Sequence, residues 1–312
     1  MSTSLSYWHT PGEHPLEFIT VPGMIDHWAS HTPEKEAYVV RMSGVERSAL
    51  TFQELKEKTE KVAAGFLQLG LVSGDYALIT GMSCTNWLIA DLACQSIGVR
   101  TVRCLTSILS KDGLLSIING HGIKALIYHP GEAGELHDHL LNCLPELFQD
   151  PVSPSSNLSI RHVISMSSNH TPPHITNIDD LLKATHDDEA MTRMQAARQA
   201  TQPDDIATVF MSSGSTGFPK AIPYTHFRLL NVMRQLRLFR QMAESGDRFF
   251  VERSMAWIGS FGFLPLAYGM CNVYVHPLLK AQDNQVDFAI KVSEWMNECM
   301  NKQEHSENLK YL

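Results

Sequence analysis

Segments with strand-like and helix-like patterns alternate along this chain, and the alternation limits its possible folds more than any other feature. One helical pattern opens at Thr51, where Thr51 and Glu54 have the spacing of a capping box, and Gly70 ends the run. The predicted strands cover residues 36–42, 76–80, 101–105 and 125–128, and the helices between them start at Thr51, Ser83 and Leu114. Strands connected through helices predict an α/β fold with a largely parallel sheet.

The second half of the chain has two changes of composition that suggest boundaries. Residues 149–177 are rich in Ser, Pro, Asn and His and predict an exposed loop around a short strand at 162–165. A polar helical pattern covers 178–200, and the Gln202-Pro203-Asp204-Asp205 turn follows it. We therefore predict a first α/β subdomain at 1–202, a partial second subdomain at 203–300 and a polar tail at 301–312.

Composition excludes several classes of protein. The 312 residues carry a formal net charge of -8 and no basic stripe, which argues against a nucleic-acid-binding protein. Six cysteines without a CxxC pair predict reduced thiols instead of a disulfide scaffold or a common zinc site. We find no secretory signal, transit peptide or membrane span. The expected location is intracellular and soluble, cytoplasmic or mitochondrial, and the oligomeric state stays open.

The segment that carries chemistry is residues 206–226. An apolar strand at 206–211 leads directly into small hydroxylated residues and glycines, and Pro219-Lys220 follows them. Glycine lets a backbone approach a ligand closely, hydroxyls and exposed N–H groups suit phosphate oxygens, and a lysine ammonium reaches polyphosphate. The residues predicted to bind a nucleotide are Ser212, Ser213, Gly214, Ser215, Thr216, Gly217 and Lys220.

Other interpretations of this loop fit the residues less well. A Walker loop needs the lysine directly after its last glycine, but two residues separate Gly217 from Lys220. A nucleophile elbow needs Gly-x-Ser-x-Gly, which Gly214-Ser215-Thr216-Gly217 does not provide. A solvent-exposed Ser/Gly turn is the remaining alternative.

The run from Ser212 to Lys220, followed by Tyr224-Thr225-His226, resembles the phosphate-binding signature of the adenylate-forming (AMP-binding) superfamily, which includes acyl-CoA synthetases. The opening of the chain, with Ser6-Tyr7 and Pro15-Leu16, is similar to medium-chain acyl-CoA synthetases in particular. The resemblance implies the large N-terminal lobe of such an enzyme, built of layered αβα subdomains. It also implies that the chain is incomplete, without the small C-terminal domain, because the later motifs of the family do not follow Leu279.

The resemblance implies a ligase that activates a carboxylic acid, expected to be a fatty acid, through an acyl-adenylate to an acyl-CoA thioester. Its small-molecule ligands would be the acid, ATP, Mg²⁺ and CoA, with Lys220 and Thr216 as catalytic residues and no metal ligand assigned. On this basis a chain of this extent is not expected to be active alone. The alternative is a non-catalytic homologue that binds a nucleotide or a partner.

Two further residues are candidates for substrate contact. The resemblance places Trp257 in a segment that lines the acyl and adenosine site, although a Trp in an apolar stretch is also typical of a core position. His226 either opens the next helix or contacts the wall of the site. His137 and His139 resemble a metal-binding pair, but on a helix they would point to different faces, so we expect them to be solvated.

Overall fold

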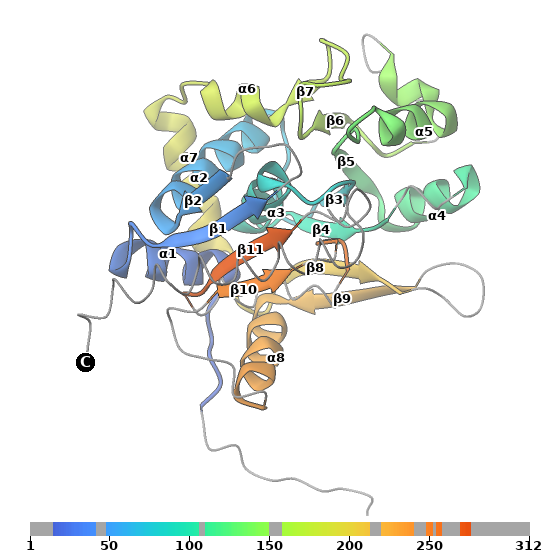
Figure 1. The fold of residues 1–312 in the computed structure, drawn as a ribbon. Coiled ribbons are helices and arrows are strands. Elements are labelled where there is room, and N and C mark those ends of the chain that lie inside the picture. The colour runs from blue at the N-terminus through green and yellow to red at the C-terminus, as the bar shows by residue number, and fades with distance from the viewer. Residues whose placement is uncertain are drawn as a thin grey trace, which may run out of the picture.

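The computed structural model describes residues 15–41, 48–105, 110–149, 158–212, 220–239, 248–251, 254–257 and 269–275 of this chain. These residues form two β-sheets with helices between and outside them (Figure 1). The helices are α1 (Val21–His31), α2 (Phe52–Gln68), α3 (Thr85–Ser96), α4 (Lys111–His121), α5 (Glu135–Cys143), the 3-10 helix η2 (Pro145–Phe148), α6 (Ile178–Lys183), α7 (Asp188–Ala200) and α8 (His226–Phe239). The strands are β1 (Glu36–Arg41), β2 (Ser48–Thr51), β3 (Tyr76–Thr80), β4 (Arg100–Arg103), β5 (Ile123–Tyr128), β6 (His162–Ser165), β7 (Thr176–Asn177), β8 (Ile206–Met211), β9 (Ala221–Thr225), β10 (Arg248–Val251) and β11 (Cys271–Val275).

The larger sheet has seven strands in the order β7-β6-β5-β3-β4-β8-β9. Every neighbouring pair is parallel except β8 and β9, which form an antiparallel hairpin at one edge. Because both faces of this sheet are covered, successive residues of β3 enter different cores: Ala77 and Ile79 face one, and Leu78 faces the other. The predicted α/β fold with a largely parallel sheet is confirmed.

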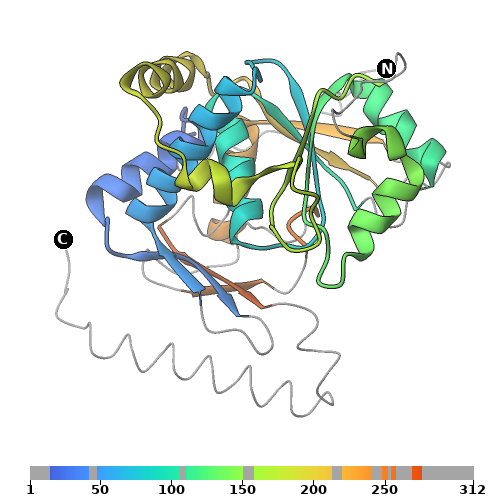
Figure 2. The same ribbon diagram turned by 90° about the horizontal axis from the view of Figure 1, so that it is seen from above.

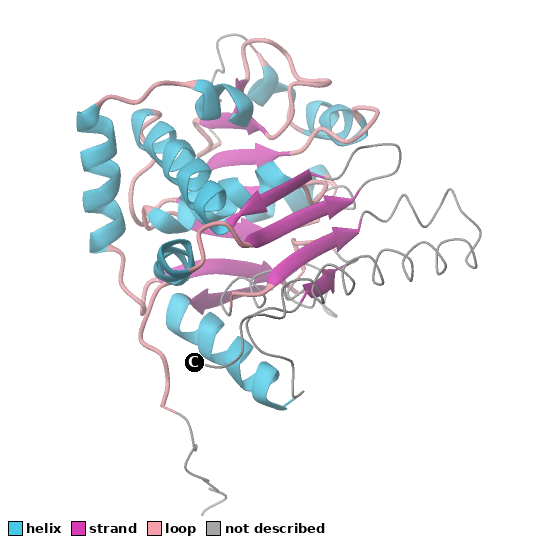
Figure 3. Cartoon of the chain, turned by 60° about the vertical axis from the view of Figure 1, so that its left-hand side comes forward, coloured by secondary structure: helices cyan, strands magenta, loops and turns pink. Residues whose placement is uncertain are grey.

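The molecule is layered, as Figure 2 shows from above. Apolar residues of α4 and α5 cover one face of the seven-stranded sheet, and those of α2 and α3 cover the other. The core on the α2 and α3 side also includes residues of β1, so the smaller sheet lies on the far side of these helices. Figure 3 shows the two sets of strands separated by helices.

The smaller sheet has the order β10-β11-β1-β2, with β1 parallel to β11 and antiparallel to β2. It joins strands from the start of the chain to strands that follow residue 203. The larger sheet does the same, because β8 and β9 extend a sheet begun by β3, β4 and β5. Residues on both sides of position 203 thus contribute strands to both sheets, and the predicted subdomain bounds stay a prediction.

Side-chain N-caps mark the start of most described helices. The Thr51 hydroxyl accepts from the Glu54 N–H and the Glu54 carboxylate accepts from the Thr51 N–H, so the predicted capping box of α2 is confirmed. The helical pattern predicted at 178–200 forms two helices, α6 and α7, instead of one continuous helix. Asp187 breaks it: its carboxylate accepts from the Ala190 N–H at 2.8 Å and starts α7 as an N-cap.

Gly81 directly follows β3 and turns the chain in a way that only glycine tolerates well. Its φ is +104°, and a Cβ there would lie 2.7 Å from the backbone oxygen of His129, which follows β5. The two strand ends therefore approach each other more closely than any side chain at position 81 would allow.

We expect Gly81→Ala to destabilise the fold by at least about 1–3 kcal/mol, because a left-handed backbone angle adds to the clash. Gly120→Ala is the matched control, because a Cβ at this α4 position meets nothing within 4 Å. In a helix that change should stabilise by up to about 1 kcal/mol. Urea unfolding measures both, and equal stability of the two variants would contradict the expected strain.

Candidate functional site

The predicted phosphate loop leaves the seven-stranded sheet at the carboxyl edge of its parallel strands. β8 is parallel to β4, and β4 to β3 and β5, so all four end at the same edge. The neighbours β3 and β5 lead in opposite directions, to β4 and to β6. Ligands of open α/β sheets bind at this edge, beside such a reversal. The loop starts at this carboxyl edge, with β4 and β3 between β8 and the reversal.

Ser212 and Lys220 form the base of this loop, between β8 and β9. The Ser212 N–H donates to the Lys220 carbonyl at 2.9 Å, and the Lys220 N–H donates to Ser212 Oγ at 3.2 Å. A hydroxyl that accepts in this way still has its own proton to donate. Lys220 is exposed, so its ammonium is accessible. The other predicted loop residues lie outside the described residues, and their roles stay predictions: Ser213, Gly214, Ser215, Thr216 and Gly217.

His226 opens α8, as one of its two interpretations predicted. Its side chain is buried, and the Val21 N–H donates to its Nδ1 at 3.3 Å. Burial lowers the pKa of His226 to about 4, with the nearby Asp205 opposing that shift. A neutral imidazole therefore connects α8 to the start of α1. The contact of His226 with a substrate stays a prediction.

Trp257 ends a short turn, Ser254 to Trp257, that follows β10. Its N–H donates to the Ser254 carbonyl at 3.0 Å, and 46% of its surface is exposed. The core interpretation of Trp257 is therefore wrong, because nearly half of its surface is exposed. Its role as a substrate contact stays a prediction.

Sequence reasoning missed the residue that connects this turn to the sheet. Arg103, the last residue of β4, donates from Nη1 to the Met255 carbonyl at 3.4 Å and forms an ion pair with Asp91 of α3. A signal was present in the sequence: each of the two charges occurs inside an apolar segment, where an ionised side chain needs a partner. That pairing was open to prediction, although its contact with Met255 was not.

The expectation of solvated histidines on α5 is wrong for His137. Its ring is buried, Nδ1 lies 2.9 Å from the Tyr128 hydroxyl, and Phe148 packs edge-on at 5.0 Å. Tyr128 comes from β5 and Phe148 from η2, so the burial depends on tertiary packing. His139 is half-buried beside Cys143.

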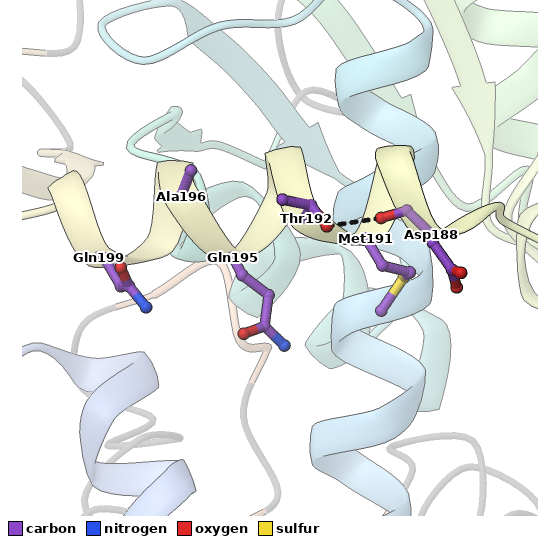
Figure 4. Close-up of a pocket in the computed structure, with 6 residues that line it drawn as sticks. All are labelled: Asp188, Met191, Thr192, Gln195, Ala196 and Gln199. Atoms are coloured by element: carbon purple, nitrogen blue, oxygen red, sulfur yellow. Dashed lines mark hydrogen bonds between the residues drawn. The ribbon is translucent and has the colours of Figure 1, made fainter.

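A separate cavity of about 490 Å³ lies beside α7 (Figure 4). Of the predicted site residues that the structure describes, none lines it. The lining residues that the structure describes all belong to one helix: Asp188, Met191, Thr192, Gln195, Ala196 and Gln199. The Thr192 hydroxyl is already bonded to the Asp188 carbonyl at 2.7 Å. The described lining comes from α7 and not from the strand ends at the sheet edge.

The described residues fit a polyphosphate better than they fit a metal ion. Ser212 offers a hydroxyl and Lys220 a cation at the start and end of the loop. Within the described ranges, no cluster of three or more His, Cys, Asp or Glu side chains could hold a metal ion. No helix in those ranges is long and apolar enough to cross a bilayer.

Several known proteins resemble this chain. The mitochondrial medium-chain acyl-CoA ligase ACSF2 of Bos taurus is 25% identical over 275 residues, which cover 84% of this chain and 43% of that protein. The acyl-CoA synthetase YngI of Bacillus subtilis, itself named putative, is 25% identical over 68% of this chain and 38% of its own length. The chain thus spans less than half the length of these relatives.

Solved structures share the fold. A long-chain-fatty-acid–CoA ligase of Archaeoglobus fulgidus superposes with a TM-score of 0.71 at 17% identity, over 94% of this chain and 53% of that one. Acetoacetyl-CoA synthetase of Streptomyces lividans gives 0.66 at 22% identity, over 83% and 39%. The family model described as "AMP-binding enzyme" matches residues 25–311. The chain therefore belongs to the AMP-binding enzyme family.

Proposed function

We propose that this chain provides the nucleotide-binding and acid-binding walls of an AMP-forming acid–CoA ligase. The observation that supports this most is the position of Ser212 at the carboxyl edge of β8, bonded to Lys220, whose side chain is exposed. Lys220 would bind the triphosphate of ATP and offset charge that develops on the departing pyrophosphate. Thr216 and the other loop residues would donate to the phosphate oxygens.

The acid-binding wall would lie beside the Ser254–Trp257 turn. Arg103 contacts Met255. Leu105 lies two residues after Arg103 and is 43% exposed, and Trp257 lies two residues after Met255 and is 46% exposed. Large apolar side chains left exposed near a ligand site favour an acid with an apolar tail. Together with the named relatives, this supports a fatty acid as the substrate. No described residue is assigned to CoA or Mg²⁺.

Lys220→Ala is expected to weaken ATP binding by about 10- to 100-fold, because a hydrogen bond to a charged group contributes about 1.5–3 kcal/mol. Isothermal titration calorimetry with ATP and with inorganic tripolyphosphate measures the loss. Both ligands should respond, since the lysine would contact the phosphates and not the base.

Lys183→Ala is the matched control, because Lys183 is an exposed lysine at the end of α6, away from the loop. Its affinities should equal those of the wild type. An unchanged tripolyphosphate affinity in Lys220→Ala would refute the proposed role. Pyrophosphate exchange with a panel of fatty acids, run on this chain and on an extended one, separates a ligase from a homologue that only binds nucleotide.

A further inference from the structure

Arg103 and Asp91 form a buried ion pair between β4 and α3. Arg103 is 2% exposed and Asp91 is 0% exposed. Nη2 of Arg103 lies 2.7 Å from Asp91 Oδ2 and Nε lies 3.3 Å from Oδ1, which is a two-point contact. Gln95 also donates to Oδ2, at 2.8 Å. Burial of such a pair costs desolvation energy, so we look for its role in the positions of the groups that it contacts and not in net stability.

The remaining side of the guanidinium faces the turn that ends at Trp257. Nη1 of Arg103 donates to the Met255 carbonyl at 3.4 Å. The Met255 N–H donates to Ser83 Oγ at 2.8 Å, and the Tyr38 hydroxyl approaches Met255 Sδ at 4.0 Å. Met255 is therefore held at its amide, its carbonyl and its sulfur by residues from three different parts of the chain.

The same guanidinium contacts the strand that leads into the phosphate loop. Its carbon lies 5.0 Å from the Phe210 ring centre, and Arg103 and Phe210 are register partners across β4 and β8. Phe210 precedes Ser212 by two residues, as Met255 precedes Trp257. One buried side chain thus contacts both chain segments immediately before they enter the proposed site.

We propose that Arg103 is a positioning residue that fixes the distance between Ser212, where the predicted phosphate loop begins, and Trp257, a proposal that rests on the function proposed above. In acid activation the carboxylate must be aligned with the α-phosphorus, and a displacement of about 1 Å can cost about 100-fold in rate. Asp91 orients the guanidinium. The oriented guanidinium then fixes Phe210 before the phosphate loop and Met255 before Trp257. Arg103 itself touches neither the nucleotide nor the acid.

Two variants separate positioning from charge. Arg103→Lys keeps the charge but loses the planar fork that reaches Asp91 and Met255 together. The double variant Arg103→Met/Asp91→Leu removes both charges and leaves no unpaired ion. Both variants lose the present bond to the Met255 carbonyl.

The first measurement is fluorine NMR of the chain labelled with 5-fluorotryptophan. Trp257→Phe assigns the Trp257 resonance, and Trp28, which packs against Phe52 of α2, serves as an internal reference. We expect both Arg103 variants to shift or broaden the Trp257 resonance and to leave the Trp28 resonance unchanged. An unchanged Trp257 resonance in both variants would overturn the proposal.

The second measurement compares the affinity for a ligand that would contact only the nucleotide-binding wall with the affinity for a ligand that would contact both the nucleotide-binding and the acid-binding walls. Inorganic tripolyphosphate should bind the double variant within twofold of the wild type. Decanoyl sulfamoyl-adenosine, a stable mimic of an acyl-adenylate, should bind at least tenfold more weakly. Equal losses for the two ligands would indicate general damage and overturn a positioning role. If the wild type binds neither ligand, the proposed function fails, whereas the fluorine spectra still decide whether Arg103 holds the turn.

Discussion

Asp91→Leu is expected to destabilise the folded chain by about 3–5 kcal/mol, because it leaves the Arg103 guanidinium buried without its counter-ion. The pair is enclosed on both sides, with Arg103 at 2% exposure and Asp91 at 0%. Burial raises the pKa of the Asp91 carboxyl, and the charge of Arg103 opposes that rise. The two-point contact at 2.7 and 3.3 Å is the geometry of an ion pair, so removing the anion leaves a cation that water cannot reach.

A double-mutant cycle in urea tests this expectation. The variant Asp91→Leu/Arg103→Met should be more stable than Asp91→Leu alone, since it contains neither charge. Arg103→Met alone should resemble Asp91→Leu, because it leaves the carboxylate buried. Additive losses across the cycle would show that the two side chains do not depend on each other.

Acidification from pH 7 to pH 4 is expected to remove up to about 3 kcal/mol of stability through His226 alone, given a folded pKa of about 4 against 6.5 in the unfolded chain. The folded pKa is lowered, so the unfolded chain binds the proton first and stability falls as the pH drops below about 6.5. The loss is complete once the pH passes below about 4, where both states are protonated. Protonation also turns Nδ1 into a donor that faces the Val21 N–H.

His226→Asn is the control for this titration, because an amide oxygen can accept from Val21 and has no proton to gain in this range. The difference in unfolding free energy between wild type and variant, followed by urea unfolding from pH 7 to pH 4, isolates the histidine from the carboxylates. A difference that stays constant over this interval would contradict the expected titration.

The parts of the fold that depend on local signals were accessible from the sequence. The capping box of α2 and the strands β3, β6 and β8 depend on residues within a few positions of each other, so their patterns are visible in a single chain. The phosphate loop is also read from consecutive residues, but its binding role stays a prediction. Its position at the carboxyl edge of β8 follows from the strand that precedes it.

The parts that depend on distant residues were not accessible. The pairing of β1 with β11 and the burial of His137 against Phe148 are set by tertiary contacts that leave no periodic pattern. The break between α6 and α7 is an intermediate case, since Asp187 is a good N-cap inside an otherwise helical segment. The contacts of Ser83 and Arg103 with Met255, two residues before Trp257, likewise join distant parts of the chain.

The pairing of β1 with β11 has a consequence for how the chain is made. Tyr38 is the register partner of Asn272, so β1 has left the ribosome long before its parallel neighbour is translated. At roughly 5–20 residues per second this delay lasts about ten to fifty seconds. During that interval one edge of β1 has no strand to pair with. The strand contains the apolar residues Val39 and Val40, so its unpaired edge is prone to association. A nascent chain halted before residue 271 should therefore be a client for chaperones that bind exposed strands.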